Sequence, residues 1–480
     1  MQAFHAYLGP NDMLAYLAMM APRLVELRRV LKPAGSIYLH CDPTASHYLK
    51  ILMDAVFGPV CFRNEICWQR STAKGHAFTR YPSAQDSLLY FSKGSEPTWH
   101  AQFLPHSDKY IRSHYANIEP ETGRRYTLGD CLNPNPDRPN LTYEWHGHKR
   151  VWRWTRTKMQ ALHDEGRLVY TRTGLPRFKR YLDEMSGSAV TSVWTDIPPI
   201  NSQAQERLGY PTQKPEALLE RIIKASSNEG GTMLDPFSGC GTAVVAAQRL
   251  GRRWIGIDIT HLAINLMKRR LRDTFGKDVQ FQVVGEPTDV AGAEALAKQD
   301  PYQFQWWALG LVDARPAEGK KGADKGIDGR IYFHDEQNEG KTKQVILSVK
   351  AGHTGVAHVR DLNGVLTRES AAIGVLITME DPTQPMIAEA ASAGFYHSPG
   401  WNQDYPRTQL RTIAELLAGK GIDVPPQHVT FKQAPKHVHN GNAQLELATS
   451  TTDSSAEAEP LAVSDKPRPL ARTRLRPKRS

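Results

Sequence analysis

The stretch TMLDPFSGCGTAVVAAQRLGRRWIGIDIT (232–260) constrains the fold more than any other part of the chain. Glycines in its turn remove side-chain bulk where a ligand must approach the backbone. Asp258 stands 23 residues after Asp235, where a carboxylate can accept hydrogen bonds from ribose hydroxyls. The pattern is typical of the first half of a nucleotide-type site. It predicts, in order, a strand over 232–235, a glycine turn over 236–241, a helix over 242–250 and a strand over 253–257.

The turn differs from the dinucleotide fingerprint GxGxxG, which would need a glycine where Val244 stands. DPFSGCGT instead resembles the motif with which amino-type DNA methyltransferases bind S-adenosylmethionine (AdoMet). The resemblance implies that Phe237, Gly239 and Gly241 line the methionine end of the cofactor, and that Asp258 holds its ribose. The alternative is an unoccupied turn of another α/β protein. The remaining residues that we expect to contact the cofactor are Asp235, Pro236, Thr242 and Lys214.

Length and charge suggest several domains and an anionic partner. At 480 residues the chain exceeds what one hydrophobic core usually fills. Its formal net charge is +10, and seven lysines and arginines against one aspartate lie within 461–480. The five cysteines show neither a CxxC pair nor zinc-ligand spacing, which predicts a reducing, cytoplasmic location. No apolar run approaches the ~18 residues of a membrane span.

The first 40 residues predict a helix followed by a strand. Apolar residues recur at helical spacing from Leu14 to Leu31, and the turn KPAG ends the helix before a strand over 36–39. This unit resembles the fifth strand, with its preceding helix, of AdoMet-dependent methyltransferases.

Further segments follow the order of the β-class of amino methyltransferases, in which the catalytic half precedes the cofactor half. Residues 64–68 and 86–91 resemble the later strands of the catalytic half. GYPTQKP (209–215) resembles the element that leads into the cofactor motif, and 216–226 supplies the helix that covers the cofactor pocket in that class.

The motif (D/N/S)PP(Y/F), which holds the exocyclic amine and stacks on the flipped base in this class, does not precede the first helix. Asp42-Pro43-Thr44 follows the strand, and 196–200 lacks the aromatic residue, so we expect both to be turns. The catalytic residue for methyl transfer is therefore unassigned. Either the reading frame is incomplete, or the chain is a truncated relative that does not transfer methyl. A sheet without its central strand would expose unpaired backbone, which favours an incomplete frame.

Residues 141–180 interleave aromatic and basic side chains, and ten lysines and arginines outnumber three acidic residues there. Basic groups neutralise phosphates, while arginine and aromatic rings read or stack on bases. We therefore expect this region to bind double-stranded DNA. The alternative is a solvated charged face over an aromatic core. The candidate DNA contacts are Trp145, Arg150, Trp152, Arg153, Arg156, Lys158, Arg177, Lys179 and Arg180.

Two strands are expected over 330–333 and 344–349, joined by a polar turn. Antiparallel pairing of these strands would bring Asp328 beside Lys350. A metal-dependent phosphodiesterase needs such a pair, because the carboxylate holds a divalent cation and the ammonium stabilises charge. Asp328 is thus the candidate ligand for Mg²⁺.

GIDG, VILSVK, the helix containing RDLNG (360–364) and a strand over 373–378 together resemble the Mrr-like catalytic domain of type IV restriction endonucleases. That fold belongs to the PD-(D/E)xK group, in which Glu or Gln stands two residues before the lysine. Here the residue is Ser348, which shares the strand face of Lys350 but is a poorer magnesium ligand. This pattern is compatible with two interpretations. Either Asp328, Ser348 and Lys350 are catalytic residues, or the domain is a DNA-binding remnant that does not cleave.

The expected fold is α/β: a Rossmann-like AdoMet-dependent methyltransferase sheet with an inserted DNA-recognition region, a smaller α/β PD-(D/E)xK-like domain and a disordered basic tail. The expected segments are a partial catalytic half (1–64), later catalytic strands with the recognition region (65–205), an AdoMet-binding half (206–285), an Mrr-like domain (300–432) and the tail (440–480).

The expected function is site-specific transfer of methyl from AdoMet to adenine N6 or cytosine N4 in duplex DNA, as in restriction–modification systems. The alternatives are a Mg²⁺-dependent endonuclease with AdoMet-linked DNA recognition, and a non-catalytic DNA-binding relative. A homodimer or a restriction–modification partner subunit is compatible with either enzyme.

Overall fold

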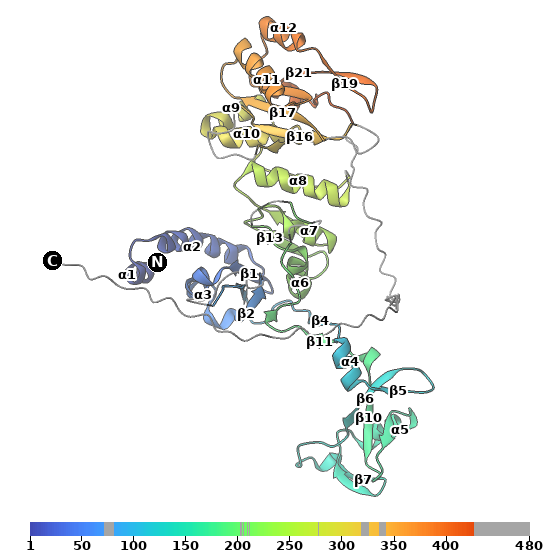
Figure 1. The fold of residues 1–480 in the computed structure, drawn as a ribbon. Helices are drawn as coiled ribbons and strands as arrows, with labels where there is room; N and C mark the ends of the chain where they lie inside the picture. Colours follow the sequence, from blue (N-terminus) through green and yellow to red (C-terminus); the bar gives the residue numbers. More distant parts are fainter. Residues whose placement is uncertain are drawn as a thin grey trace, which may run out of the picture. The chain divides into compact units, whose positions relative to one another are not determined.

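The computed structural model describes residues 1–71, 81–201, 204, 206–208, 210, 212–276, 278–317, 326–335 and 342–426 (Figure 1). The predicted disordered tail (440–480), as well as Gly209 and Pro211 of the GYPTQKP segment, lies outside these residues.

The N-terminal part is a four-stranded sheet with helices packed against it. Leu17, Met20 and Leu24 of α2 are buried against the sheet and α3, and the Asn11 side chain caps the start of α2 by accepting from the Leu14 N–H. The sheet order is β1-β3-β2-β12. The predicted helix and strand are thereby confirmed. The elements are α1 (Gln2–Leu8), α2 (Asp12–Val30), β1 (Ser36–Cys41), α3 (Pro43–Phe57), β2 (Phe62–Gln69), β3 (Gln85–Ser92) and β12 (Val193–Trp194).

A small domain follows, built on the antiparallel sheet β5-β6-β10-β9 and the separate hairpin β7–β8. Its core contains two tryptophans, Trp145 and Trp152, packed with Met159 and Leu162 of α5. The elements are β4 (Phe103–Leu104), α4 (Asp108–His114), β5 (Asn117–Ile118), β6 (Arg125–Asp130), β7 (Thr142–Trp145), β8 (His148–Val151), α5 (Arg156–Asp164), β9 (Leu168–Tyr170), β10 (Pro176–Tyr181) and β11 (Ser188–Ala189).

Residues 232–260 fold as predicted, into strand, turn, helix and strand. β13 and β14 pair in parallel, with Thr232 opposite Arg253 and Asp235 opposite Gly256. α6 joins this unit to the first sheet, because Leu218 packs with Trp68 while Ile223 packs against α7. The elements are α6 (Glu216–Ser226), β13 (Thr232–Asp235), α7 (Thr242–Arg249), β14 (Arg253–Gly256) and α8 (His261–Phe275).

The single Rossmann-like sheet expected from the sequence is not what the structure shows, although the α/β class is confirmed. Within the described residues, β13 and β14 pair only with each other, and β1 pairs only with β3. The local sequence predicts each strand. A continuous sheet would also need a strand that connects the β1-β3-β2-β12 sheet to the β13–β14 pair. The edges of β1 and β13 therefore carry backbone groups without a strand partner in this part of the chain.

The C-terminal domain is a five-stranded sheet, β15-β16-β17-β18-β21, covered on both faces (Figure 1). Val345, Leu347 and Val349 of β17 face α9 and α10, whereas Ile346 faces α11 and α12. β18 is buried throughout, as a central parallel strand should be. This core includes Ala293, so the domain begins before the predicted boundary at residue 300.

The elements of this domain are α9 (Val290–Gln299), α10 (Pro301–Gly310), β15 (Arg315–Pro316), β16 (Gly329–Phe333), β17 (Lys343–Lys350), α11 (Val356–Arg368), β18 (Ile373–Thr378), α12 (Gln384–Ser392), β19 (Phe395–Ser398), β20 (Gln403–Pro406), β21 (Thr408–Thr412) and α13 (Ile413–Leu417). Of the helices in the described ranges, none combines the length and apolar character needed to cross a bilayer.

Replacing Trp152 by alanine should unfold the small domain. The indole is fully buried, and its Nε1–H donates to the Tyr143 carbonyl at 2.8 Å. Loss of a buried tryptophan costs about 3–5 kcal/mol, which is comparable to the stability of a domain this small. Limited proteolysis should show cleavage within 103–190 in Trp152→Ala, while Trp99→Ala, at a half-exposed indole, keeps the wild-type pattern. Equal protease resistance of both variants would contradict this assignment.

Candidate cofactor site and nucleic-acid interface

Two glycines shape the turn between β13 and α7. Gly239 and Gly241 have φ of +50° and +73°, in the left-handed backbone region that residues with a side chain rarely adopt. A Cβ on Gly239 would lie 2.9 Å from the Tyr210 ring, and one on Gly241 would lie 2.5 Å from Met267 Cγ. Both the backbone conformation and the close approach therefore require glycine at these positions.

Asp258 closes the turn from the end of β14. One carboxylate oxygen, Oδ2, accepts from the Gly239 N–H at 2.9 Å, while Oδ1 accepts from the Thr260 N–H at 3.0 Å and the Thr260 hydroxyl at 2.9 Å. The sequence predicted a ribose ligand here, and the structure adds that the same carboxylate holds the turn. A carboxylate has about four lone-pair sites, so ribose hydroxyls can still be accepted.

Of the remaining turn residues, Phe237 exposes its ring, whereas burial affects the carboxyl group of Asp235. The Phe237 side chain is half exposed beside the turn, and its N–H donates to Asp235 Oδ1 at 3.1 Å. Burial raises the pKa of Asp235 above its ordinary value. The Asp235 carbonyl accepts from Ile257 N–H at 2.9 Å, which fixes Pro236 and the start of the turn between the two strands. The arrangement leaves an aromatic face exposed beside the turn, whereas the amides of Phe237, Ser238, Gly239 and Gly241 are hydrogen-bonded within the protein.

A buried arginine, which the sequence analysis missed, supports the turn from beneath. Arg270 of α8 donates from Nη1 to the Cys240 carbonyl at 3.2 Å and to the Thr242 hydroxyl at 2.9 Å. Its Nη2 lies 3.8 Å from Glu216 Oε2 at the start of α6. The sequence does carry a signal, because position 270 falls on the apolar stripe of α8 with Ala263, Met267 and Leu271.

Glu216 connects this support to a second arginine. It also pairs with Arg249 of α7, and burial raises the pKa of Glu216 despite the two arginines. The turn between β13 and α7, together with α6, α7 and α8, is thus held by one charge network, in which Arg270 is buried, Glu216 is mostly buried and Arg249 is partly exposed. Lys214, predicted to contact the cofactor, stands two residues before Glu216, and its charge acts on Asp86 of the N-terminal sheet.

Charged groups lie at the end of the N-terminal sheet where β1 and β2 end and β3 begins. Asp86, at the start of β3, accepts from His40 Nε2 at 2.8 Å and lies 3.3 Å from Arg70 Nε. Burial alone would raise the pKa of Asp86, but His40, Arg70 and Lys214 together lower it. The Asp86 carboxylate is therefore ionised at neutral pH and pairs with the exposed Arg70 at this end of the sheet.

The two segments with partial likeness to the amine-binding motif were predicted to be turns. Asp42-Pro43-Thr44 instead begins α3, whereas 196–200 lies outside the helices and strands. Asp42 caps α3 by accepting from Thr44 N–H at 3.0 Å and Ala45 N–H at 3.1 Å. Asp196 is paired with both Nη atoms of Arg221.

The structure separates the predicted DNA contacts into buried and exposed residues. Trp145 and Trp152 are buried in the core of the small domain, so their prediction as DNA contacts is corrected: the aromatic positions of this segment form its core. Lys179 is half buried and paired with Glu119, and Arg177 lies 3.8 Å from Asp130. The predicted contacts that remain exposed are Arg150, Arg153, Arg156, Lys158 and Arg180.

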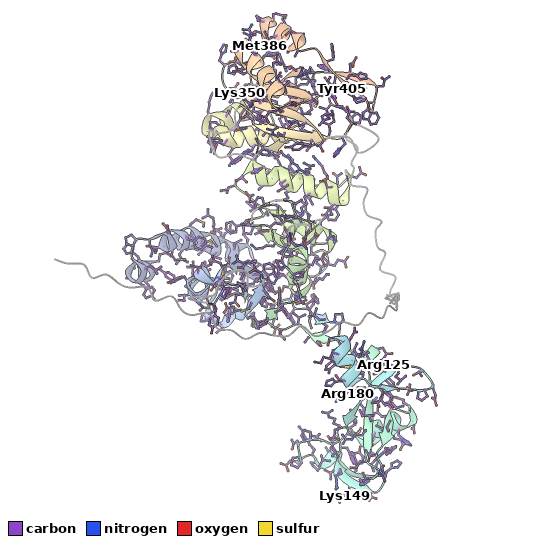
Figure 2. The ribbon with its side chains drawn as sticks, viewed as in Figure 1. Arg125, Lys149, Arg180, Lys350, Met386 and Tyr405 are labelled. Carbon is purple, nitrogen blue, oxygen red and sulfur yellow. The ribbon has the colours of Figure 1, made fainter. Side chains whose placement is uncertain are left out.

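Basic residues extend along the small domain instead of forming one cluster. Figure 2 shows Lys149 at one end, on the β7–β8 hairpin, and Arg125 and Arg180 at the other. Arg125 and Lys149 are exposed and were not among the predicted contacts. An extended basic surface suits a backbone that carries a phosphate at every nucleotide.

In the C-terminal domain, Asp328 and Lys350 do lie together, with Lys350 Nζ 3.6 Å from Asp328 Oδ2. Asp328 is nevertheless engaged within the protein. Its Oδ2 accepts from Val349 N–H at 2.7 Å and from Ser348 Oγ at 3.2 Å, and its Oδ1 accepts from Gln305 at 2.8 Å. The described residues contain no group of three His, Cys, Asp or Glu that could hold a metal ion. Magnesium binding by Asp328 therefore has little geometric support.

The structure is that of an α/β protein with a strand–turn–helix–strand unit of the kind found at nucleotide-type sites. Residues 2–269 match the family model of DNA methylases that modify N6 or N4, so the chain belongs to that family. Residues 303–418 match a second model, the NACHT-associated inactive restriction endonuclease 1.

The chain is also similar to individual proteins. The chain is 49% identical over 248 residues to the DNA adenine methyltransferase YhdJ of Escherichia coli K12, covering 52% of this chain and 64% of that protein. It is 29% identical over 270 residues to type II methyltransferase M.EcaI of Enterobacter cloacae, covering 55% and 59%. The chain thus spans about three fifths of these relatives. The M1.HpyAVI–SAM complex is 17% identical with a TM-score of 0.30, covering 55% of this chain and 85% of that one.

Arg270→Met should loosen the cofactor turn. The substitution removes two donors to the turn and one partner of Glu216. Removing one partner of a buried pair typically costs about 3–5 kcal/mol, and the loss should be smaller here because Glu216 keeps Arg249. Urea denaturation should show the loss, and the double variant Arg270→Met/Glu216→Gln should recover part of it.

The matched control is Arg269→Met, on the same helix but in an exposed pair with Asp273. Its free energy of unfolding should change by less than about 1 kcal/mol. Equal effects of the two single substitutions would show that Arg270 has no special role.

Proposed function

We propose that this protein is a site-specific DNA methyltransferase that transfers methyl from AdoMet to an exocyclic amine, adenine N6 or cytosine N4, of duplex DNA. The observation that carries the proposal is the turn of Gly239 and Gly241, held by Asp258, within a chain of the N6/N4 DNA methylase family. The feature that supports AdoMet here is Asp258, which can accept from ribose hydroxyls, with the exposed Phe237 ring beside the turn; Tyr210 and Met267 occupy the space next to the two glycines.

The cofactor residues of the proposal are those of the turn and its surroundings. Amide groups at the start of α7 and the positive end of its dipole suit the methionine carboxylate. Asp258 accepts from ribose hydroxyls, and the exposed Phe237 ring packs on the methionine end. Bound AdoMet supplies an electrophilic methyl group. The contacting residues we propose are Asp235, Pro236, Phe237, Gly239, Gly241, Thr242, Asp258 and Lys214.

The small domain supplies DNA recognition in this proposal. Its exposed arginines and lysines neutralise phosphates and set the register of the duplex. The target base would leave the stack to reach the site, whose residues would orient its amine in line with the methyl group. The group that binds the amine is unassigned, since Asp42 and Asp196 both have structural partners. Methyl transfer by this chain is therefore proposed without an assigned amine-binding residue.

For the C-terminal domain, we propose an Mrr-like PD-(D/E)xK fold that does not cleave DNA. The position of Asp328 beside Lys350 supports the fold, while Ser348 and the occupied Asp328 oxygens argue against a magnesium site. A Mg²⁺-dependent endonuclease is the alternative. We also place the protein in the cytoplasm, consistent with five free cysteines, and expect a restriction–modification partner subunit or a second copy as a further partner.

Calorimetry tests the cofactor assignment. Wild-type protein should bind AdoMet, and Gly239→Leu and Asp258→Ala should each abolish measurable binding, because one fills the turn and the other releases it. Gly230→Leu is the matched control, since Gly230 also has positive φ but open space around it. Unchanged affinity in Gly239→Leu and Asp258→Ala would refute the assignment.

Methyl transfer is then measured with tritiated AdoMet and random-sequence duplex DNA. The proposal expects tritium on DNA, with the methylated nucleoside identified by mass spectrometry. Tight binding of both AdoMet and DNA without transfer would support the non-catalytic alternative instead.

The C-terminal domain makes a separate prediction. Duplex DNA incubated with the protein and Mg²⁺ should stay intact on a sequencing gel, since both Asp328 oxygens already accept hydrogen bonds and Ser348 stands where a second carboxylate ligand would be needed. Cleavage that disappears in Lys350→Ala would overturn this part and favour the endonuclease.

A further inference from the structure

The unit that contains the β13–α7 turn and the C-terminal domain meet along two helices, α8 and α10. At the start of α8, the His261 N–H donates to Gln303 Oε1 of α10 at 2.9 Å. Four residues further along α8, Asn265 Nδ2 donates to the Trp306 carbonyl at 2.7 Å. A Cβ on Gly310 would lie 2.1 Å from Asn265 Nδ2, so glycine is needed for this close approach. The two helices are therefore joined by directed polar contacts.

The Gln303 side chain is available to α8 because of how α10 begins. Asp300 is the N-cap of α10 and accepts from the Gln303 N–H at 3.2 Å. In a capping box, a glutamine at this position would accept from the Asp300 N–H in return. Here the Asp300 N–H donates instead to the Leu296 carbonyl of α9 at 2.8 Å. Gln303 is thereby released from the capping role that its position in the sequence suggests.

On α8, Gln303 satisfies a backbone donor of the first turn. The N–H groups of a first turn have no partner within their own helix. The Thr260 hydroxyl accepts from the Ala263 N–H at 3.2 Å, and Gln303 accepts from the His261 N–H. The start of α8 is thus held partly by a side chain of the C-terminal domain. Residues 2–269 and 303–418 match separate family models, so this contact joins the two matched segments.

Thr260 connects this helix start to the Asp258 carboxylate. Its N–H and its hydroxyl both donate to Asp258 Oδ1, and Asp258 Oδ2 accepts from the Gly239 N–H. His261, which donates to Gln303, follows Thr260 directly in the chain. A displacement of the His261 amide would therefore move the residue that orients Asp258.

We propose that Gln303 is a positioning residue for the AdoMet site, which makes the C-terminal domain part of the cofactor-binding unit. It acts on the start of α8 and, through Thr260, on the orientation of Asp258. α10 is itself fixed, because Phe304 and Trp307 pack in the core of the C-terminal domain. A rigid support of this kind sets how well a carboxylate meets its ligand. The inference rests on the proposed function, since it requires AdoMet to bind at the turn.

Calorimetric titration of the full chain with AdoMet tests the proposal. Gln303→Met keeps the size of the side chain but removes the acceptor for the His261 N–H. Gln303→Asn keeps an amide that is one methylene too short to reach it. Each should raise the dissociation constant for AdoMet about two- to tenfold, the factor that corresponds to one lost hydrogen bond.

Two further variants separate positioning from packing. Gln303→Glu restores an acceptor, and its charge is favoured beside the N-terminus of α8, so its dissociation constant should stay within about twofold of the wild-type value. Gln299→Met, the same substitution at an exposed residue of α9, is the matched control and should bind AdoMet like the wild type.

Unchanged affinity in Gln303→Met and Gln303→Asn, with AdoMet bound by the wild type, would overturn this inference and leave the proposed function standing. If one of these two variants fails to fold, the other decides. Equal weakening by Gln303→Glu would also overturn it, because the acceptor would then not be what matters. Absence of AdoMet binding to the wild type would refute the cofactor assignment and this inference together.

A second measurement needs no cofactor. Hydrogen–deuterium exchange of the ligand-free protein should show a faster-exchanging His261 amide in Gln303→Met than in Gln303→Glu, since a hydrogen-bonded amide is protected. Equal exchange rates in the two variants would show that Gln303 does not hold the start of α8, which contradicts the proposal.

Discussion

The proposed cofactor site depends on the hydrogen bond from the Gly239 N–H to Asp258. This bond joins the end of β14 to the turn after β13, and the same carboxylate caps the entry to α8 through Thr260. The turn is thereby fixed before any ligand arrives. A preformed turn spares the cofactor the entropic cost of ordering it, which is the physical meaning of a preorganised site.

Beneath the turn, a second set of interactions resists deformation. Arg270 is buried among Cys240, Thr242 and Glu216, where a lone charge would be expensive. Its hydrogen bonds and its acidic partner offset that cost and tie α8 to α6 and α7. The support therefore comes from helices that bracket the motif in the sequence, which explains why the motif alone does not reveal it.

Much of the site followed from the sequence because it rests on local chemistry. Glycines with positive φ and a carboxylate after a strand are set within a few residues, and the turn appears as expected. The Asp328–Lys350 contact also forms, but the predicted register was wrong: Gly329 pairs with Leu347, which places Asp328 opposite Ser348. Trp145 and Trp152 could not be placed this way, because interleaved aromatic and basic residues fit either a DNA-binding face or a core under a charged surface. Tertiary packing decided for the core.

The continuity of the first sheet was equally beyond local reasoning. Each strand was recognisable, but whether β1 and β13 share a sheet depends on what lies between them, and the described residues place no strand there. The C-terminal domain shows the converse case. Its strands were predictable, while the contact between Gln303 and His261 arises only when α10 packs against α8.

The central claim is that the turn between β13 and α7 is where AdoMet binds. Ultraviolet crosslinking of the full chain with methyl-tritiated AdoMet, followed by peptide mapping, tests it most directly. If AdoMet binds at this turn, the label lies within 232–260 and is displaced by excess unlabelled AdoMet. Displaceable label confined to peptides elsewhere in the chain would contradict it.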